Sequence, residues 1–253
     1  MPLDLNGDKI YSASIGPEGQ PIRQVVTSGM IAYIDAGDLN SYPASGTTWT
    51  DISGIGNTCS ISNGSYNGAN GGSIVFNGSN TYAYKGAFTS PPTTAITLET
   101  FIKFADTGNG GRYVMALGRD IGGATGGMAL IAYGYASAAS GQVLFEFGSS
   151  IGRVSFGFVP TVGIWYHLAV TSDGSNTRSY VNGNLQNTAA QAGGSVASSP
   201  GFSVGSYLNA SIPPTPSSAW CYGNIAVVRV YNRTLSSSEI LQNFYAQKSR
   251  FGL

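Results

Sequence analysis

Short runs in which hydrophobic and polar residues alternate dominate the chain from residue 30 onward. In residues 98–104 the charged Glu99 and Lys103 stand between apolar positions. A period of two places successive side chains on opposite faces of an extended strand, so this pattern predicts half-buried β-strands. The predicted strands are residues 30–35, 73–77, 95–104, 112–118, 127–133, 142–148, 153–158, 164–172, 178–181, 202–206 and 222–231.

Glycine, asparagine, serine and proline fill the segments between these strands, as is typical of turns. Asn182-Gly183 follows the strand that ends at Val181 and predicts a two-residue hairpin, because a type I′ turn needs positive φ at both central residues. Many short strands joined by such turns predict an all-β fold, a two-sheet antiparallel sandwich.

One short helix is predicted at the C-terminus. Ser236 and Glu239 have the spacing of a capping box, in which the hydroxyl and the carboxylate satisfy the first free amides of the helix. The apolar stripe that follows at helical spacing consists of Ile240, Leu241, Phe244 and Tyr245. We expect this stripe to pack against the sandwich rather than to recruit a partner.

Residues 1–28 differ from the rest and predict an extended N-terminal arm ahead of a single domain over residues 29–253. Within the arm, residues 16–19 (Gly-Pro-Glu-Gly) predict a turn between two strand-like runs. The first twelve residues lack the basic and apolar regions of a secretory signal. We therefore expect synthesis in a cytoplasm, where Cys59 and Cys221 stay reduced and unpaired.

Charge and hydropathy exclude two classes of partner. The chain has 253 residues with 12 Lys and Arg against 12 Asp and Glu, which is 9% charged residues and no net charge. A nucleic-acid binder needs a basic stripe, so nucleic acid is not expected as a partner. No apolar run reaches the length of a membrane span, so the sequence predicts no membrane partner.

Three segments together carry a family resemblance. They are residues 49–57 (W-x-D-x-S-G-x-G-N) with 72–78, residues 164–174 with 179–183, and residues 223–236 with Glu239. This pattern resembles the laminin-G-like, concanavalin A-like lectin/glucanase jelly roll. The resemblance implies a jelly-roll sandwich. It says little about activity, because the fold serves lectins, glycosidases, adhesins and scaffolds.

Residues 33–37 and 41–49 resemble the versions of this domain that are common in tailed bacteriophages. That resemblance implies a non-enzymatic virion structural protein: a head decoration, a fibre or a tail-associated module. The arm would then contact other virion proteins, and the protein would be assembled in the host cytoplasm and released by lysis. A homo-oligomer is expected, because virion modules follow the symmetry of the particle.

The sequence predicts no catalytic residue. Glucanases of this fold carry a Glu-x-Asp-x-x-Glu pattern on one strand. Here the four glutamates, Glu18, Glu99, Glu146 and Glu239, have no acidic neighbour two to five positions on. Glu99 and Glu146 are expected to face solvent. The single histidine, His167, lies in a predicted structural strand, and no nucleophile motif accompanies it.

Calcium and carbohydrate are the candidate ligands of the alternative function, a calcium-assisted adhesin that recognises host surface glycans. Relatives of the fold bind Ca²⁺ near a sheet rim, and Asp51 and Asn57 lie in the matching turn. The competing interpretation is that Asp51 orders that turn. Asp173, in a hairpin loop, is interpreted as a turn residue.

The predicted sugar site is the long, proline-stiffened loop of residues 206–216, which leads to Trp220. Tyr207, Asn209 and Trp220 would supply an aromatic platform and an amide group, as a sugar requires. The competing interpretation places Trp220 in the core, because a strand follows it directly.

Overall fold

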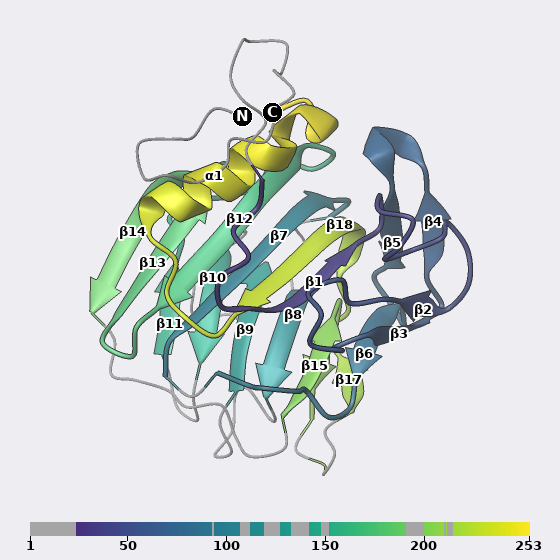
Figure 1. Ribbon diagram of the computed structural model, residues 1–253, viewed down its shortest axis with the longest axis horizontal. Coiled ribbons are helices and arrows are strands. Elements are labelled where there is room, and N and C mark those ends of the chain that lie inside the picture. Colours follow the sequence, from purple (N-terminus) through teal and green to yellow (C-terminus); the bar gives the residue numbers. More distant parts are fainter. Residues whose placement is uncertain are drawn as a thin grey trace, which may run out of the picture.

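Two antiparallel β-sheets face each other in the computed structural model, which describes residues 24–92, 94–106, 112–118, 127–132, 142–147, 152–190, 200–209, 211 and 215–253 (Figure 1). The predicted sandwich with one short C-terminal helix is therefore confirmed. Residues 1–23, which make up most of the predicted arm, lie outside the described part of the chain.

The front sheet has the order β14-β13-β12-β7-β18-β5-β4, and β1 also pairs with β18. β18 lies at the centre of this sheet, where it pairs with β1, the first strand of the domain, and with β5 and β7. The strands of the front sheet are β1 (Met30–Asp35), β4 (Ser65–Asn67), β5 (Ser73–Asn77), β7 (Ile96–Phe104), β12 (Trp165–Ser172), β13 (Asn176–Val181), β14 (Asn184–Ala190) and β18 (Tyr222–Tyr231).

The back sheet has the order β11-β10-β9-β8-β15-β6-β3-β2, and β16 pairs with β17 in a separate hairpin. Its strands are β2 (Thr48–Trp49), β3 (Cys59–Ser62), β6 (Tyr82–Lys85), β8 (Arg112–Gly118), β9 (Gly127–Ala132), β10 (Val143–Phe147), β11 (Gly152–Ser155) and β15 (Gly201–Val204). The separate hairpin consists of β16 (Tyr207–Leu208) and β17 (Pro216–Ser218).

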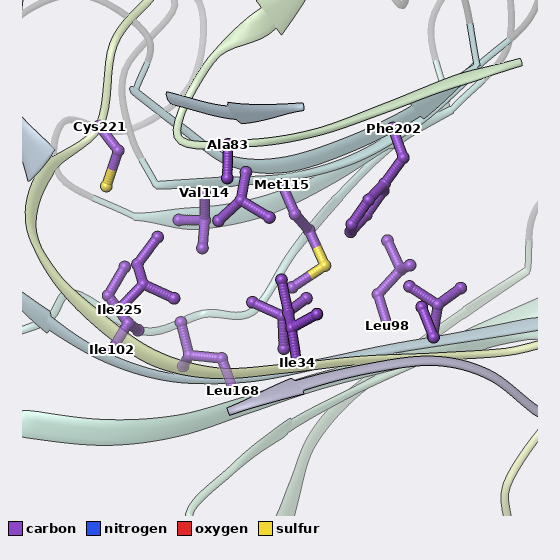
Figure 2. Packing of buried hydrophobic residues seen from close by; sticks show 14 of the residues in the cluster. Ile34, Ala83, Leu98, Ile102, Val114, Met115, Leu168, Phe202, Cys221 and Ile225 are labelled. Atoms are coloured by element: carbon purple, nitrogen blue, oxygen red, sulfur yellow. The ribbon is translucent and has the colours of Figure 1, made fainter. Parts of the chain in front are cut away.

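The main core fills the space between the two sheets (Figure 2). Leu98 and Leu168 enter it from the front sheet, and Val114, Met115 and Phe202 enter it from the back sheet. Removal of this apolar surface from water is the main force that holds the two layers together.

Cys59 and Cys221 lie in this core as free thiols. Burial raises the pKa of both thiols to about 12, so they stay protonated and unreactive. The prediction that the two cysteines are unpaired is confirmed.

Helix α1 (Ser237–Gln247) covers the outer face of the front sheet (Figure 1). The capping box is confirmed: Ser236 Oγ accepts a hydrogen bond from Glu239 N, and the Glu239 carboxylate accepts one from Ser236 N. Hydrogen bonds from Arg233 hold the pKa of Glu239 down at about 2. Ile240 and Phe244 are buried, as the predicted stripe requires, whereas Tyr245 is 43% exposed.

The hairpin between β13 and β14 matches its prediction and also makes room for the helix. Asn182 and Gly183 both have positive φ, of 50° and 76°. A Cβ at position 183 would lie 2.8 Å from Leu241 of α1, so glycine serves both the turn and the packing. Two 3₁₀ turns complete the helical elements of the described chain, η1 (Ala69–Gly71) and η2 (Lys248–Phe251).

A layer of buried charges lies between α1 and the front sheet. Glu99 Oε1 is 2.5 Å from His167 Nε2 and 3.3 Å from Arg229 Nη1, and Glu99 Oε2 accepts a 2.8 Å hydrogen bond from Asn243 Nδ2. Glu99, His167 and Arg229 are fully buried. The expectation that Glu99 faces solvent is wrong, because its outward-facing position on β7 is covered by the helix.

Arg250 of η2 fastens the C-terminus to the front sheet. Its guanidinium donates 2.6 Å hydrogen bonds to Asp35 Oδ1 and to the carbonyl of Gly72, and a 2.9 Å bond to the carbonyl of Asn70. A side chain at position 37 would overlap this guanidinium, so Gly37 leaves the space that Arg250 fills.

The segment that leads into β1 is held on the same helix-covered side. Val26 N donates to Asn243 Oδ1 at 2.7 Å, and the hydroxyl of Tyr231 donates to the carbonyl of Val26 at 3.0 Å. Gln242 donates to the carbonyl of Gln24 at 2.7 Å. Residues 24–26 are therefore tied to α1 and β18. In the part of the chain that the structure describes, no helix has the length and apolar character to span a membrane.

Candidate functional site

The outer face of the back sheet carries a row of side chains that crosses several strands. Tyr84 on β6 pairs with Ser203 on β15, and Ser203 pairs with Ala116 on β8. Residues paired directly across a sheet share a face, and alternate residues of each strand point into the core instead. At the other end of this face, Glu146 on β10 pairs with Arg153 on β11.

The β16–β17 hairpin lies over the centre of this face. Leu208 packs with Tyr113 and Ala116 in an apolar cluster that is separate from the main core. The ring of Tyr207 meets that of Tyr113 edge-on, with ring centroids 5.3 Å apart. Ser203 Oγ donates to the carbonyl of Ser206, which fixes the start of the hairpin.

Trp220 is held beside the hairpin and stacks on Tyr82 of β6. The two ring centroids are 5.8 Å apart and the ring planes differ by 27°. Tyr113 N donates a 2.9 Å hydrogen bond to the carbonyl of Ala219, and Tyr113 forms a parallel bridge with Trp220. Ala219 has a φ of 53°, a left-handed conformation that costs energy in a residue other than glycine and is often found at functional sites.

Arg112, at the start of β8, fastens the backbone of Trp220. Its Nη1 donates 3.0 Å hydrogen bonds to the carbonyls of Trp220 and Gly78. Its Nη2 forms an ion pair with Asp106 at 3.0 Å. The side chain of Arg112 therefore connects β8, the turn after β5 and the segment before β18.

Glu146 carries a second ion pair on this face. It accepts a 2.9 Å hydrogen bond from the hydroxyl of Tyr113, and Arg153 contacts its other oxygen at 3.0 Å. The side chain of Glu146 is only 6% exposed. The expectation that Glu146 faces solvent is therefore wrong, because a tyrosine and an arginine cover it on the outer face of the sheet.

Four half-buried aromatic side chains lie on this side of the sandwich, and we call them the aromatic patch: two of them pack around Tyr113, and the other two stack on each other. They are Tyr82, Tyr84, Tyr207 and Trp220. Aromatic rings with one exposed side stack on the apolar faces of sugar rings, and their polar atoms can bind hydroxyl groups. The patch thus has the chemistry of a saccharide-binding surface.

The structure brings two of the three predicted sugar-site residues together. Tyr207 and Trp220 both contact Tyr113, one through its ring and the other through its backbone. Asn209 instead closes the hairpin loop, since its Oδ1 accepts from Thr215 N at 2.9 Å and its Nδ2 donates to Thr215 Oγ1 at 2.8 Å.

Sequence reasoning missed Tyr82, Tyr84 and Tyr113 as members of this surface. Tyr82 and Tyr84 are two positions apart, a spacing that places both on one face of a strand. That signal was present in the sequence. The proximity of β6 and β8 to Trp220 was not, because it depends on the order of strands in the sheet.

Asp51, the first predicted calcium ligand, orders its own loop. One carboxylate oxygen accepts hydrogen bonds from Tyr33 N and Ser53 N at 2.8 and 2.9 Å. The other accepts from Ser53 Oγ, Gly56 N and Asn57 N at 2.8 to 3.0 Å. Five protein donors therefore occupy the two oxygens that a cation would need.

Asn57, the second predicted ligand, is fully buried and bridges two backbone segments. Its Oδ1 accepts from Thr89 N at 2.7 Å, and its Nδ2 donates to the carbonyls of Ile31 and Thr89. Asp173 likewise caps its own turn, accepting from Ser175 N and Asn176 N. Among the described residues, no three His, Cys, Asp or Glu side chains gather where they could hold a metal ion.

We expect Asp51→Asn to lower the free energy of unfolding by about 2 kcal/mol, because the amide would face N–H groups that now donate to a carboxylate. We also expect calcium chloride and EDTA to leave the melting temperature of the unmodified chain unchanged. Both quantities can be measured by thermal and urea unfolding. A calcium-dependent rise in melting temperature that Asp51→Asn abolishes would instead assign a calcium ion to this loop.

Comparison with known proteins gives the family. The model of the concanavalin A-like lectin/glucanases superfamily, laminin-G type, matches residues 76–241. The chain belongs to this superfamily. A search of curated protein sequences found no match to the chain.

Solved structures share the fold at low sequence identity. Domain 4 of AbnA, an extracellular GH43 arabinanase from Geobacillus stearothermophilus solved with arabinotriose, is 16% identical, with a TM-score of 0.63 over 86% of this chain and 98% of that one. Trypanosoma rangeli sialidase in complex with sialic acid is 17% identical, with a TM-score of 0.61 over 95% of this chain and 36% of that one. The binding domain of a botulinum neurotoxin of serotype D/C is 12% identical, with a TM-score of 0.59 over 87% and 53%.

Proposed function

We propose that the chain is a non-enzymatic carbohydrate-binding module and that the aromatic patch binds the saccharide, with glycans of a host surface as its targets. The observation that carries the proposal is the gathering of four half-buried rings on one sheet face, with Trp220 stacked on Tyr82. The similar arabinanase domain, almost all of which this chain covers, was solved with arabinotriose.

The placement of the carboxylates supports binding without hydrolysis. A retaining glycosidase needs two carboxyl groups about 5–5.5 Å apart that flank the bond to be broken. Glu99 is fully buried beneath α1, on the other side of the sandwich from the patch. Near the patch, Asp106 and Glu146 are each paired with an arginine.

We expect Trp220→Ala and Tyr82→Ala each to weaken saccharide binding about tenfold, because a stacked ring contributes roughly 1.5 kcal/mol. The measurement starts with a glycan array of the unmodified chain. Titration of the best-bound glycan against each variant by isothermal calorimetry then gives the affinities.

Tyr245→Ala is the matched control, since it removes an exposed tyrosine from α1 on the opposite side of the sandwich. It should leave the affinity unchanged. Equal binding by the unmodified chain, Trp220→Ala and Tyr82→Ala would place the sugar elsewhere. No binding to any glycan on the array would contradict the proposed function.

A second candidate, display of this module on a bacteriophage virion, is favoured by where the chain enters the domain. Residues 24–26 are tied to α1 and β18 on the outer face of the front sheet, whereas the aromatic patch lies on the outer face of the back sheet. A module attached to other virion proteins through the preceding arm would therefore present its patch away from the attachment point.

For this second candidate we expect the full chain to form a symmetric oligomer that depends on residues 1–23. The measurement is molar mass by light scattering after size exclusion, for residues 1–253 and for residues 24–253. Equal melting temperatures of the two chains would establish that the shorter one is folded. The same number of subunits for both chains would show that the arm takes no part in the assembly.

A further inference from the structure

We propose that Arg112 is a positioning residue of the aromatic patch, and that the patch takes an uncharged saccharide because the charge of Arg112 is committed to Asp106. This inference rests on the proposed carbohydrate-binding function and specifies its ligand. In this role Arg112 holds Trp220 in place and does not contact an acidic group of the saccharide.

The guanidinium of Arg112 contacts three acceptors at once. Nη1 lies 3.0 Å from the carbonyl oxygens of both Gly78 and Trp220, and Nη2 lies 3.0 Å from Asp106 Oδ2. The turn at Gly78 has a φ of 75°, and a Cβ there would lie 2.9 Å from Tyr222. Glycine thus lets this carbonyl reach Arg112. A lysine ammonium has no planar fork and cannot reproduce the three contacts at once.

The start of β8 fixes the backbone on both sides of Trp220. Arg112 holds the carbonyl of Trp220, and Tyr113, the next residue of β8, holds the carbonyl of Ala219. Two consecutive peptide groups are therefore fixed to consecutive residues of one strand, with Ala219 kept in its left-handed conformation. A platform fixed in this way before binding loses little conformational entropy when a saccharide stacks on it.

Ion pairs balance positive and negative charge on the described part of this face. Among the described residues, Arg112 and Arg153 are the arginines near the patch, and each has a carboxylate partner at 3.0 Å, Asp106 for Arg112 and Glu146 for Arg153. An acidic saccharide would bring its own carboxylate or sulfate close to Asp106 and Glu146 and would have to compete with them for the guanidinium groups. A neutral saccharide meets no such repulsion, and its hydroxyl groups can bind the polar atoms of the tyrosines.

The test uses the full chain on an array that carries neutral glycans beside their sialylated, uronic-acid-containing and sulfated counterparts, at low and high sodium chloride. Arg112→Lys, Arg112→Gln and Asp106→Asn are then titrated with the neutral glycan that binds best and with its acidic counterpart. Iodide quenching of tryptophan emission is recorded for each variant. Trp49 and Trp165 are buried, so Trp220 is the tryptophan that iodide reaches.

We expect the unmodified chain to prefer neutral glycans with an affinity that salt does not change. Arg112→Lys and Arg112→Gln should both lose about tenfold in affinity and change the quenching of Trp220. Asp106→Asn should keep neutral binding, because Arg112 still holds both carbonyls, and should gain salt-sensitive binding of the acidic counterpart. Melting temperatures of all variants show whether each remains folded at the temperature of the titration.

Three results would overturn the inference while leaving carbohydrate binding in place. They are a preference of the unmodified chain for acidic glycans that falls with salt, full affinity in Arg112→Lys, and unchanged Trp220 quenching in both Arg112 variants. Absence of binding to every glycan is a different result, since it removes the proposed function itself.

Discussion

Replacing Glu99 with alanine is expected to lower the free energy of unfolding by about 3–5 kcal/mol, the cost of breaking a buried ion pair by removing one partner. The variant leaves the Arg229 guanidinium fully buried with no carboxylate beside it. It also leaves Asn243 without the acceptor for its 2.8 Å hydrogen bond. Urea unfolding at neutral pH measures the loss.

The pH dependence of stability should report the same carboxylate. Burial alone would raise the pKa of Glu99, but the charge of Arg229 and hydrogen bonds from His167 and Asn243 outweigh burial and lower it. The folded pKa therefore lies below the unfolded value of about 4.3. The stability that Glu99 contributes is complete above that pH and is lost as pH falls through the folded pKa. Glu99→Ala should remove this part of the acid sensitivity.

Asp173→Asn is the control for Glu99→Ala, because it removes the charge of an exposed carboxylate that lies 3.7 Å from Arg178 and keeps Oδ1, which accepts the hydrogen bonds of the turn. Surface ion pairs contribute about 0–1 kcal/mol, so we expect little change. A similar loss of unfolding free energy in both variants would show that the buried carboxylate of Glu99 stabilises the fold no more than an exposed one.

Arg250→Ala should cost about 2–4 kcal/mol, because it removes three hydrogen bonds and leaves the buried Asp35 without its cationic partner. The loss should be visible first as release of the C-terminal residues, in faster amide hydrogen exchange across η2. Arg178→Ala is the control, since it removes an arginine that is 36% exposed and fastens no terminus. Unchanged exchange in η2 would show that packing of Phe251, and not the arginine, holds this end.

The elements that could be predicted are those whose signals are local. The alternation in β7, the Asn182-Gly183 hairpin and the capping box at Ser236 each lie within a few consecutive residues, and all three are present in the structure. β14 was not predicted, because Asn184–Ala190 is an exposed, largely polar segment with no hydrophobic period.

The burial of Glu99 could not be predicted from its own strand. Its position on the outer face of β7 would be solvent-exposed in a bare sandwich, and what covers it includes Asn243 of a helix that begins more than a hundred residues later. Glu146 is a similar case, since its partner Tyr113 comes from another strand. Non-local covering of this kind leaves no periodic trace in the sequence.

The candidate site was predictable only where its residues share one loop. Tyr207 and Trp220 could be predicted together because the same proline-rich segment, residues 206–220, carries both. Tyr82, Tyr84 and Tyr113 come from β6 and β8, and their place beside that loop follows from the strand order of the back sheet. Calcium binding by Asp51 and Asn57 stays a prediction from the sequence, and thermal unfolding with calcium chloride or EDTA tests it.

The central place of β18 sets the order in which the domain can be completed during synthesis. This strand pairs with β1, β5 and β7, all of which leave the ribosome more than a hundred residues earlier. Until residues 222–231 emerge, the front sheet has a gap at its middle and β1 has no strand beside it. Pairings so distant in sequence close slowly, and the waiting strands expose unpaired edges. The nascent chain is thus most prone to aggregation in the period before residues 222–231 emerge.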